Sequence, residues 1–218
     1  MILSRRAVAT AFVLSLATVA VAGLPDPARA QQKAPTPAQV SEPVKLGDIV
    51  LGAENAPVTI IEYASMTCSH CANFANNTFP KLKETYIDTG KVRYVFREFP
   101  LDRVAMAAAV VARCVGETDK AKTFALVEVL FAQQDKWAFK DQIPALQTFA
   151  KQFGMGEAAF EACFADDARI KSIRADTVRA NEVLGVNSTP TFFINGTMYP
   201  GLATIDQVEK IIKPLLGN

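Results

Sequence analysis

The sequence predicts an α/β fold in which a block of helices is inserted into a small sheet. Short apolar stretches of strand length lie near residues 58–64, 92–99 and 191–199. From residue 102 to residue 184, apolar residues recur instead at close to helical spacing. The last stretch has to meet the first two to complete one sheet, so the helical block is most simply an insertion.

The first part of the chain alternates strands and a helix. Asp48–Gly52 fits a short edge strand, and Val58–Ala64 is the apolar run of a buried strand. A helix is predicted from about Cys71 to Thr89, and Gly90 fits the position just beyond its end. Val92–Phe99 alternates apolar and charged residues over its middle, which indicates the next strand.

The block from Asp102 to about Leu184 is predicted to hold four or five helices. Short polar side chains mark the expected helix starts, because they accept hydrogen bonds from the first free backbone N–H groups. These expected N-caps are Asp102, Thr118, Asp141 and Asp166.

A hairpin and a helix are expected at the end of the chain. Thr191–Ile194 and Thr197–Tyr199 flank Asn195-Gly196, the pair preferred in a type I′ turn, whose central residues both need positive φ. Asp206–Leu216 has the apolar spacing of an amphipathic helix.

The N-terminus reads as an export signal. Two arginines precede an apolar stretch from Ala7 to Gly23, and Ala28-Arg29-Ala30 fits a cleavage site. A membrane anchor is disfavoured, since a spanning helix needs about 20 apolar residues. Residues 1–30 are therefore expected to be a removed signal peptide and residues 31–47 a flexible, partly extended Pro-rich lead-in, with the protein in the periplasm.

The charge balance argues against several partners. The chain carries 23 basic and 22 acidic residues, and residues 1–30 remove three arginines and one aspartate from that balance. No basic patch calls for nucleic acid or marks a membrane surface. An exported chain meets an oxidising compartment, where disulfides form and persist.

Cys68-Ser69-His70-Cys71 is the most informative motif, since it holds two of four cysteines and the single histidine. It follows a predicted strand and opens a predicted helix, which places Cys68 at a helix N-terminus. Free N–H groups and the helix dipole favour a thiolate there, the form that attacks disulfides. We therefore predict thiol–disulfide exchange, with Cys68 as nucleophile, a buried Cys71 as resolving thiol and a cationic His70 that lowers the pKa of Cys68.

Three segments, Glu62–Cys71, Val92–Pro100 and Gly185–Gly196, resemble those of DsbA-like thiol–disulfide oxidoreductases. The resemblance extends over the chain after about Lys45. It implies a thioredoxin-like sheet with an inserted all-helical domain: residues 48–100 and 185–218 form the thioredoxin-like domain, and residues 101–184 the insertion. The best-known members carry Pro-His between the cysteines, so their redox poise does not transfer directly to Ser-His.

The resemblance also implies site residues outside the motif. A matching acid, here Glu62, lies beneath the active-site helix and relays protons to the buried cysteine; the alternative is an exposed strand carboxylate. Thr189-Pro190 is implied to contain a cis peptide bond that faces the cysteines, so that the backbone of Thr189 pairs with an extended substrate. We assign Ser69, together with Thr189 and Pro190, to substrate binding.

Cys114 and Cys163 lie in the predicted helical block. They could be free thiols packed as small apolar residues, or a structural disulfide such as some DsbA-like proteins carry. The oxidising compartment favours the disulfide. Zinc would need these two cysteines beside Cys68 and Cys71 to complete four ligands, and we expect no metal.

The function predicted from these residues is dithiol oxidation of reduced exported proteins by a monomer that needs no cofactor. A membrane oxidant would reoxidise the pair, as in the DsbB–quinone route. One alternative is a disulfide isomerase or reductase. Another is a non-enzymatic exported protein that binds unfolded peptides.

Overall fold

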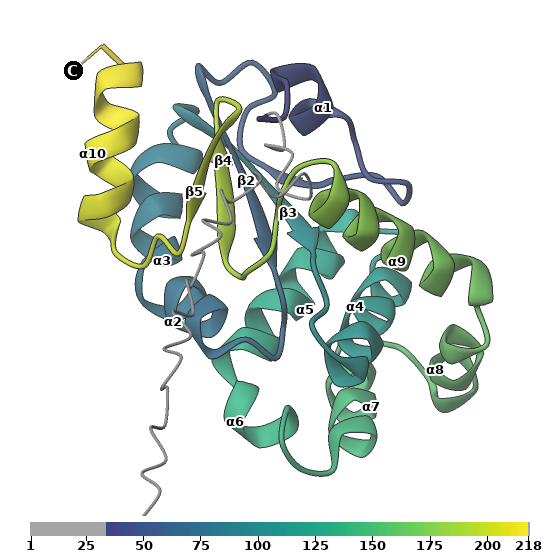
Figure 1. The fold of residues 1–218 in the computed structure, drawn as a ribbon. Coiled ribbons are helices and arrows are strands. Elements are labelled where there is room, and N and C mark those ends of the chain that lie inside the picture. Colours follow the sequence, from purple (N-terminus) through teal and green to yellow (C-terminus); the bar gives the residue numbers. More distant parts are fainter. Residues whose placement is uncertain (1–33, 218) are drawn as a thin grey trace, which may run out of the picture. The chain divides into compact units, whose positions relative to one another are not determined.

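The computed structural model describes residues 34–217 and contains one five-stranded sheet (Figure 1). The predicted signal peptide lies outside the described residues. The strands follow the spatial order β1-β3-β2-β4-β5. Their bounds are β1 Ile49–Leu51, β2 Val58–Ala64, β3 Val92–Glu98, β4 Thr191–Ile194 and β5 Thr197–Pro200.

The sheet joins segments from the two ends of the described chain. β2 pairs in parallel with β3, whereas β4 pairs antiparallel with β2, with Glu62 opposite Phe192. The predicted hairpin is present, and Asn195 and Gly196 have φ of 44° and 85°. Because β2 and β3 are parallel, the residues after Ala64 and after Glu98 emerge at the same edge of the sheet.

The helix predicted from Cys71 to Thr89 begins earlier and is not continuous. It consists of α2 Ser69–Asn77, α3 Phe79–Leu82 and a π-helical turn at Lys83–Ile87. Pro80 lies in the first turn of α3 and has no N–H to continue the ladder. The break falls at Thr78, whose hydroxyl donates to the Ala203 carbonyl ahead of the last helix, α10 Ile205–Leu215.

Between β3 and β4 the chain forms six helices, one more than the upper prediction. The additional element is α6, a single turn. The bounds are α4 Arg103–Val115, α5 Lys120–Ala132, α6 Gln134–Trp137, α7 Gln142–Gln152, α8 Glu157–Phe164 and α9 Asp167–Glu182. This arrangement confirms the predicted α/β class with a helical insertion.

The predicted N-caps are correct in part. Asp102 and Asp166 accept hydrogen bonds from the first turns of α4 and α9. Thr118 was the wrong cap for α5, because the next residue, Asp119, accepts from the Ala121 N–H. Asp141 precedes α7 but has φ of 48° and makes no side-chain capping bond.

The lead-in contains a short helix that the sequence does not predict. Pro37–Ser41 is a helix, α1, where an extended segment was expected. Thr36 and Gln39 form a reciprocal capping box, and Pro37 suits the first helical position. Val40 is buried against the sheet.

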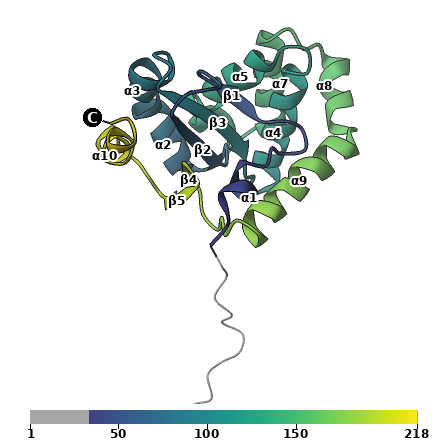
Figure 2. The same ribbon diagram turned by 90° about the horizontal axis from the view of Figure 1, so that it is seen from above.

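Helices cover both faces of the sheet (Figure 2), and an apolar cluster lies on each face. The larger lies under α2, α3 and the helical insertion, and it includes the fully buried Trp137. The smaller lies under α1 and the end of α9 and includes Tyr63 and Val95. Over residues 34–217, none of the helices combines the length and apolar character that a membrane span needs.

Candidate active site

Cys68 occupies the N-cap of α2, in the short connection that follows β2. Its backbone is extended, with φ of −79° and ψ of 120°. At an N-cap, a side-chain acceptor meets the N–H groups two and three residues later. Here these are the N–H groups of His70 and Cys71, and both lower the pKa of the Cys68 thiol. A thiolate at Cys68 therefore acts as the capping anion of the helix.

The pKa of Cys68 falls from 9.0 to about 5. The largest cause is a hydrogen bond from the Cys71 thiol, and the Thr189 hydroxyl and the two N–H groups act in the same sense. Burial of the half-exposed side chain opposes them. Cys68 is thus a thiolate at neutral pH in the reduced protein.

The Thr189–Pro190 segment lies directly against Cys68. The peptide bond is cis, and the protonated Cys68 thiol donates to the Thr189 carbonyl at 3.4 Å. The Thr189 hydroxyl is buried and has no hydrogen-bond partner among the described residues. This hydroxyl is therefore available to donate to sulfur once Cys68 is ionised.

Cys71 has the opposite character. Its side chain is fully buried, one helical turn after Cys68. Burial raises its pKa far above the ordinary value, and the hydrogen bond to Cys68 and the charge of Glu62 add to the rise. The two thiols of the motif are thus unequal: one is an accessible nucleophile and the other retains its proton.

Glu62 is a buried acid, and only 2% of its surface is exposed. Burial raises its pKa to about 8, the charge of Cys68 acts in the same direction, and a hydrogen bond from Tyr94 partly offsets the rise. The hydroxyl of Tyr94 donates to Glu62 from the neighbouring strand β3. The buried position agrees with the family-based expectation rather than with an exposed strand carboxylate.

His70 and Ser69 are exposed in the first turn of α2. From the sequence, a cationic His70 imidazole was expected to lower the Cys68 pKa. In the structure His70 contributes through its backbone N–H, and the largest contribution comes from Cys71. A role for the imidazole stays a prediction, as does substrate contact by Ser69.

Three residues at this site were missed in the sequence. Asp102, predicted only as a helix cap, also accepts from the Thr67 hydroxyl at 2.6 Å, next to Cys68. Tyr94 could have been noticed, because alternation in β3 places it on the face shared with Glu62. Gln134 donates to the carbonyls of Met66 and Cys68 at 2.8 and 3.1 Å, and no local sequence pattern predicts these hydrogen bonds.

Cys114 and Cys163 are bonded to each other, from α4 to α8, with their Cα atoms 6.2 Å apart. They lie in the helical insertion and are not free to join Cys68 and Cys71 around zinc. Within the described range, no group of three potential metal ligands was found.

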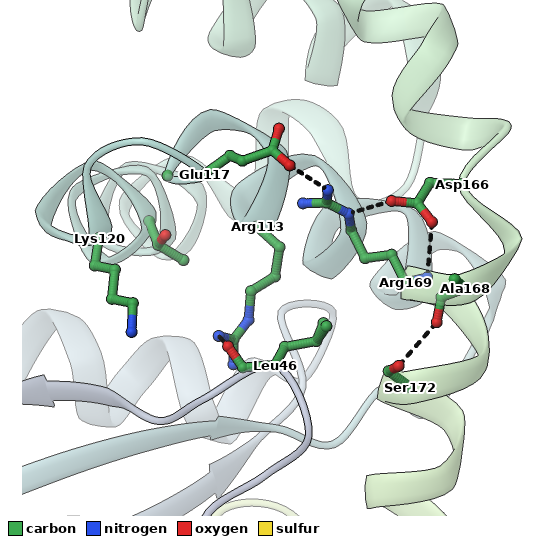
Figure 3. A pocket seen from close by; sticks show the side chains of 10 residues that line it. Leu46, Arg113, Glu117, Lys120, Asp166, Ala168, Arg169 and Ser172 are labelled. Atoms are coloured by element: carbon green, nitrogen blue, oxygen red, sulfur yellow. Dashed lines mark hydrogen bonds and ion pairs between the residues drawn. The ribbon is translucent and has the colours of Figure 1, made fainter.

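A cavity of about 310 Å³ lies between the insertion and the residues before β1, away from the redox motif (Figure 3). Its arginines are already engaged. Arg169 pairs with Glu117 and Asp166, and Arg113 donates to the Leu46 and Gly47 carbonyls. These arginines therefore have structural partners within the part of the chain that the structure describes.

Comparison with known proteins agrees with this geometry. A family model described as thioredoxin matches residues 45–214. A Rickettsia conorii protein named as a protein-disulfide oxidoreductase is 35% identical over 87% of this chain and 69% of its own length.

Two solved structures share the fold. The α-DsbA1 of Wolbachia pipientis is 33% identical, covers 84% of this chain and 96% of its own, and superposes with a TM-score of 0.76. BdbD from Bacillus subtilis, at 23% identity, covers 86% of this chain and 98% of its own with a TM-score of 0.70. The chain belongs to the DsbA-like thiol–disulfide oxidoreductases of the thioredoxin fold.

Proposed function

We propose that this protein is an exported dithiol oxidase that introduces disulfides into other exported proteins. The observation that carries the proposal is the contrast between a stabilised Cys68 thiolate and a buried, protonated Cys71. A protein that stabilises its thiolate favours the dithiol over the disulfide. Its disulfide is then a strong oxidant.

The reaction begins with the Cys68–Cys71 disulfide. A substrate thiolate attacks the Cys68 sulfur, a new bond joins the two proteins, and Cys71 leaves with the electron pair of the broken bond. A second substrate thiolate then attacks the substrate sulfur of this mixed disulfide and releases Cys68 as a thiolate. The substrate loses two electrons, which the Cys68–Cys71 pair gains. Attack by Cys71 on the mixed disulfide is the reverse of the first step and frees stalled substrates.

Glu62 supplies the proton that Cys71 needs. A thiolate in the buried position of Cys71 would be costly, since burial disfavours its charged form. With a pKa of about 8, Glu62 is protonated at neutral pH and can give its proton to the leaving sulfur. The transfer leaves Glu62 as a carboxylate, which takes up a proton from solvent because its pKa lies above neutral pH. The reduced state then carries one stabilised charge, at Cys68.

Thr189 and Pro190 would hold the substrate. The Thr189 carbonyl already contacts the Cys68 sulfur, so a substrate cysteine bonded to Cys68 would lie beside this backbone. Main-chain pairing gives affinity without demanding a particular sequence, which suits an oxidase of many reduced proteins. We further propose a membrane oxidant as the partner that restores the disulfide.

Two measurements test the proposal. The reduction potential of Cys68–Cys71 in glutathione buffers should lie near that of strong oxidants, and the oxidised protein should rapidly form disulfides in a reduced, unfolded substrate. Cys68→Ser should abolish this activity. The double variant Cys114→Ala/Cys163→Ala is the matched control and should keep it. A potential as low as that of thioredoxin would instead favour the reductase alternative.

Export needs its own test. If residues 1–30 are a signal peptide, the protein recovered outside the cytoplasm should begin near Gln31. Mass spectrometry of the recovered protein measures this directly. A soluble product that retains residues 1–30 would contradict the proposed export.

A further inference from the structure

We propose that Gln134 is a positioning residue: from the helical insertion, its side-chain amide holds the backbone on both sides of Thr67 and so sets the place of Cys68. The inference rests on the proposed role of Cys68 as the nucleophile. It concerns how a residue 66 positions later in the chain fixes that nucleophile.

Both hydrogens of the Gln134 amide are used at the redox loop. The same nitrogen donates to the Met66 carbonyl at 2.8 Å and to the Cys68 carbonyl at 3.1 Å. A glutamine side chain has two donors on this nitrogen, so the donating capacity is complete. Only 8% of the residue is exposed, and loss of the bonds would leave poorly solvated carbonyls without this partner.

The start of α2 needs such support because Cys68 is an unusual N-cap. Ser, Thr, Asp or Asn normally fills that position, and α2 has no capping hydrogen bond from a side chain in the thiol form. Within α2, the Cys68 carbonyl makes only the first helical bond, from the Ala72 N–H at 3.0 Å. Gln134 donates a second hydrogen bond to the Cys68 carbonyl and another to the Met66 carbonyl. These two bonds fix the extended backbone of the loop and so the position of the Cys68 sulfur.

The helix that carries Gln134 is anchored in the core. Gln134 begins α6, and Trp137 in the same helical turn is fully buried and donates from its indole nitrogen to the Leu130 carbonyl at 2.7 Å. A second contact runs in the opposite direction, from Asn76 of α2 to the Phe131 carbonyl of α5 at 3.2 Å. The end of α5 and α6 therefore form a fixed support against which the redox loop is placed.

Asn76 provides a matched control. Its amide also makes a hydrogen bond to the helical insertion, but among the described residues it makes no hydrogen bond to the Met66–Cys68 loop. Loss of Asn76 should weaken only the docking of the insertion. Loss of Gln134 should also move the sulfur relative to the His70 and Cys71 N–H groups.

The experiment measures Cys68 in the full chain by ultraviolet titration of the thiolate and by its equilibrium with glutathione. We expect Gln134→Met to raise the Cys68 pKa by about one unit and to shift the equilibrium about tenfold toward the disulfide. Gln134→Leu also lacks the donors and adds no charge, and it should shift both values by a similar amount. Asn76→Ala should leave both within experimental error of wild type.

The titrating groups coupled to Cys68 are Cys71 on α2 and Glu62 on β2, and both are retained in every variant. Urea unfolding of each variant confirms that it is folded, and Gln134→Leu replaces Gln134→Met if the latter is not. The inference is overturned if the folded Gln134 variants titrate like Asn76→Ala. If wild-type Cys68 itself titrates near 9, the proposed role of Cys68 fails first, and the two failures are thus distinguishable.

Discussion

Two buried ionisable residues, Glu62 on β2 and Arg97 on β3, lie on opposite faces of the same sheet and differ in how fully their charges are paired. Arg97 is fully buried, yet it pairs with Asp48 at 2.9 and 3.0 Å and donates to the Tyr63 hydroxyl. It also donates to the carbonyls of Val40 and Glu42. Glu62 has the Tyr94 hydroxyl as its hydrogen-bond donor and no cation paired with it among the residues that the structure describes.

The number and charge of the partners account for the difference. Burial lowers the pKa of Arg97, but the hydrogen bonds and charge of Asp48 outweigh it, so the pKa is raised and the side chain stays charged. Burial raises the pKa of Glu62 to about 8, and one hydroxyl does not compensate. A buried charge with complete partners holds the chain together, whereas one with incomplete partners exchanges protons near neutral pH.

Removal of Arg97 should produce a large loss of stability at neutral pH. Arg97→Met would leave Asp48 buried without its cation, and breaking a buried ion pair costs about 3–5 kcal/mol. The free energy of unfolding from urea titration measures the loss. Arg93→Met is the control, because Arg93 lies on the same strand and its side chain makes no hydrogen bond or ion pair within residues 34–217. Equal losses in the two variants would show that the partners of Arg97 do not matter.

Glu62→Gln should change how the stability of the reduced protein depends on pH. The folded pKa of Glu62 is raised from 4.5 to about 8, so its contribution is fully present below pH 4.5 and is lost as pH rises to 8. The loss is on the order of 5 kcal/mol. The pKa of Cys68 is lowered from 9.0 to about 5, so its contribution is lost as pH falls from 9 to 5.

These two contributions oppose each other between pH 5 and pH 8. The free energy of unfolding of reduced wild type should therefore vary little in that window. Urea titration at a series of pH values should show stability that rises with pH in Glu62→Gln and falls with pH in Cys68→Ser. Parallel curves for the three proteins would contradict the buried, protonated state of Glu62.

Thr189→Val tests whether a thiolate, like the Arg97 guanidinium, depends on its hydrogen-bond partners. The variant removes a buried hydroxyl that lowers the pKa of Cys68. A hydrogen bond to a charged group contributes about 1.5–3 kcal/mol, which corresponds to a rise of about one to two units in that pKa. Thr191→Val is the control, because the Thr191 hydroxyl donates to the Ser188 carbonyl in the same loop. A comparable rise in the control would assign the effect to loop distortion.

His70→Ala should produce the smallest effect. The side chain is exposed, and interactions of exposed charges are screened, so we expect the Cys68 pKa to rise by less than about half a unit. Ultraviolet titration of the reduced variant beside Ser69→Ala measures it. A rise larger than that of Thr189→Val would restore the imidazole to the tuning role that the sequence suggested.

The sequence predicted the parts of the molecule that local pattern controls. Val58–Ala64 was assigned with its observed bounds, because a buried strand reads as a continuous apolar run. Asn195-Gly196 predicted the observed turn, because both residue types tolerate positive φ. The break of α2 at Thr78 was missed, because its hydroxyl bond to Ala203 joins segments 125 residues apart.

The candidate site divides in the same way. Cys68 and Cys71 were found from their spacing and from the strand and helix around them. The contact of Gln134 with the redox loop and the partners of Arg97 depend on how distant segments pack. No periodicity records such packing, so these residues became visible only in the folded chain.

The position of Cys68 at the N-cap of α2 has a consequence for motion. As a thiolate, its sulfur accepts from the His70 and Cys71 N–H groups and closes the first turn of the helix. In a disulfide the sulfur carries no negative charge, and those two amides lose their strongest acceptor. We therefore expect the His70 and Cys71 amides to exchange with solvent faster in the oxidised protein than in the reduced protein. Under the proposed oxidase reaction, this turn would be held less tightly in the state that admits a substrate than in the state that releases it.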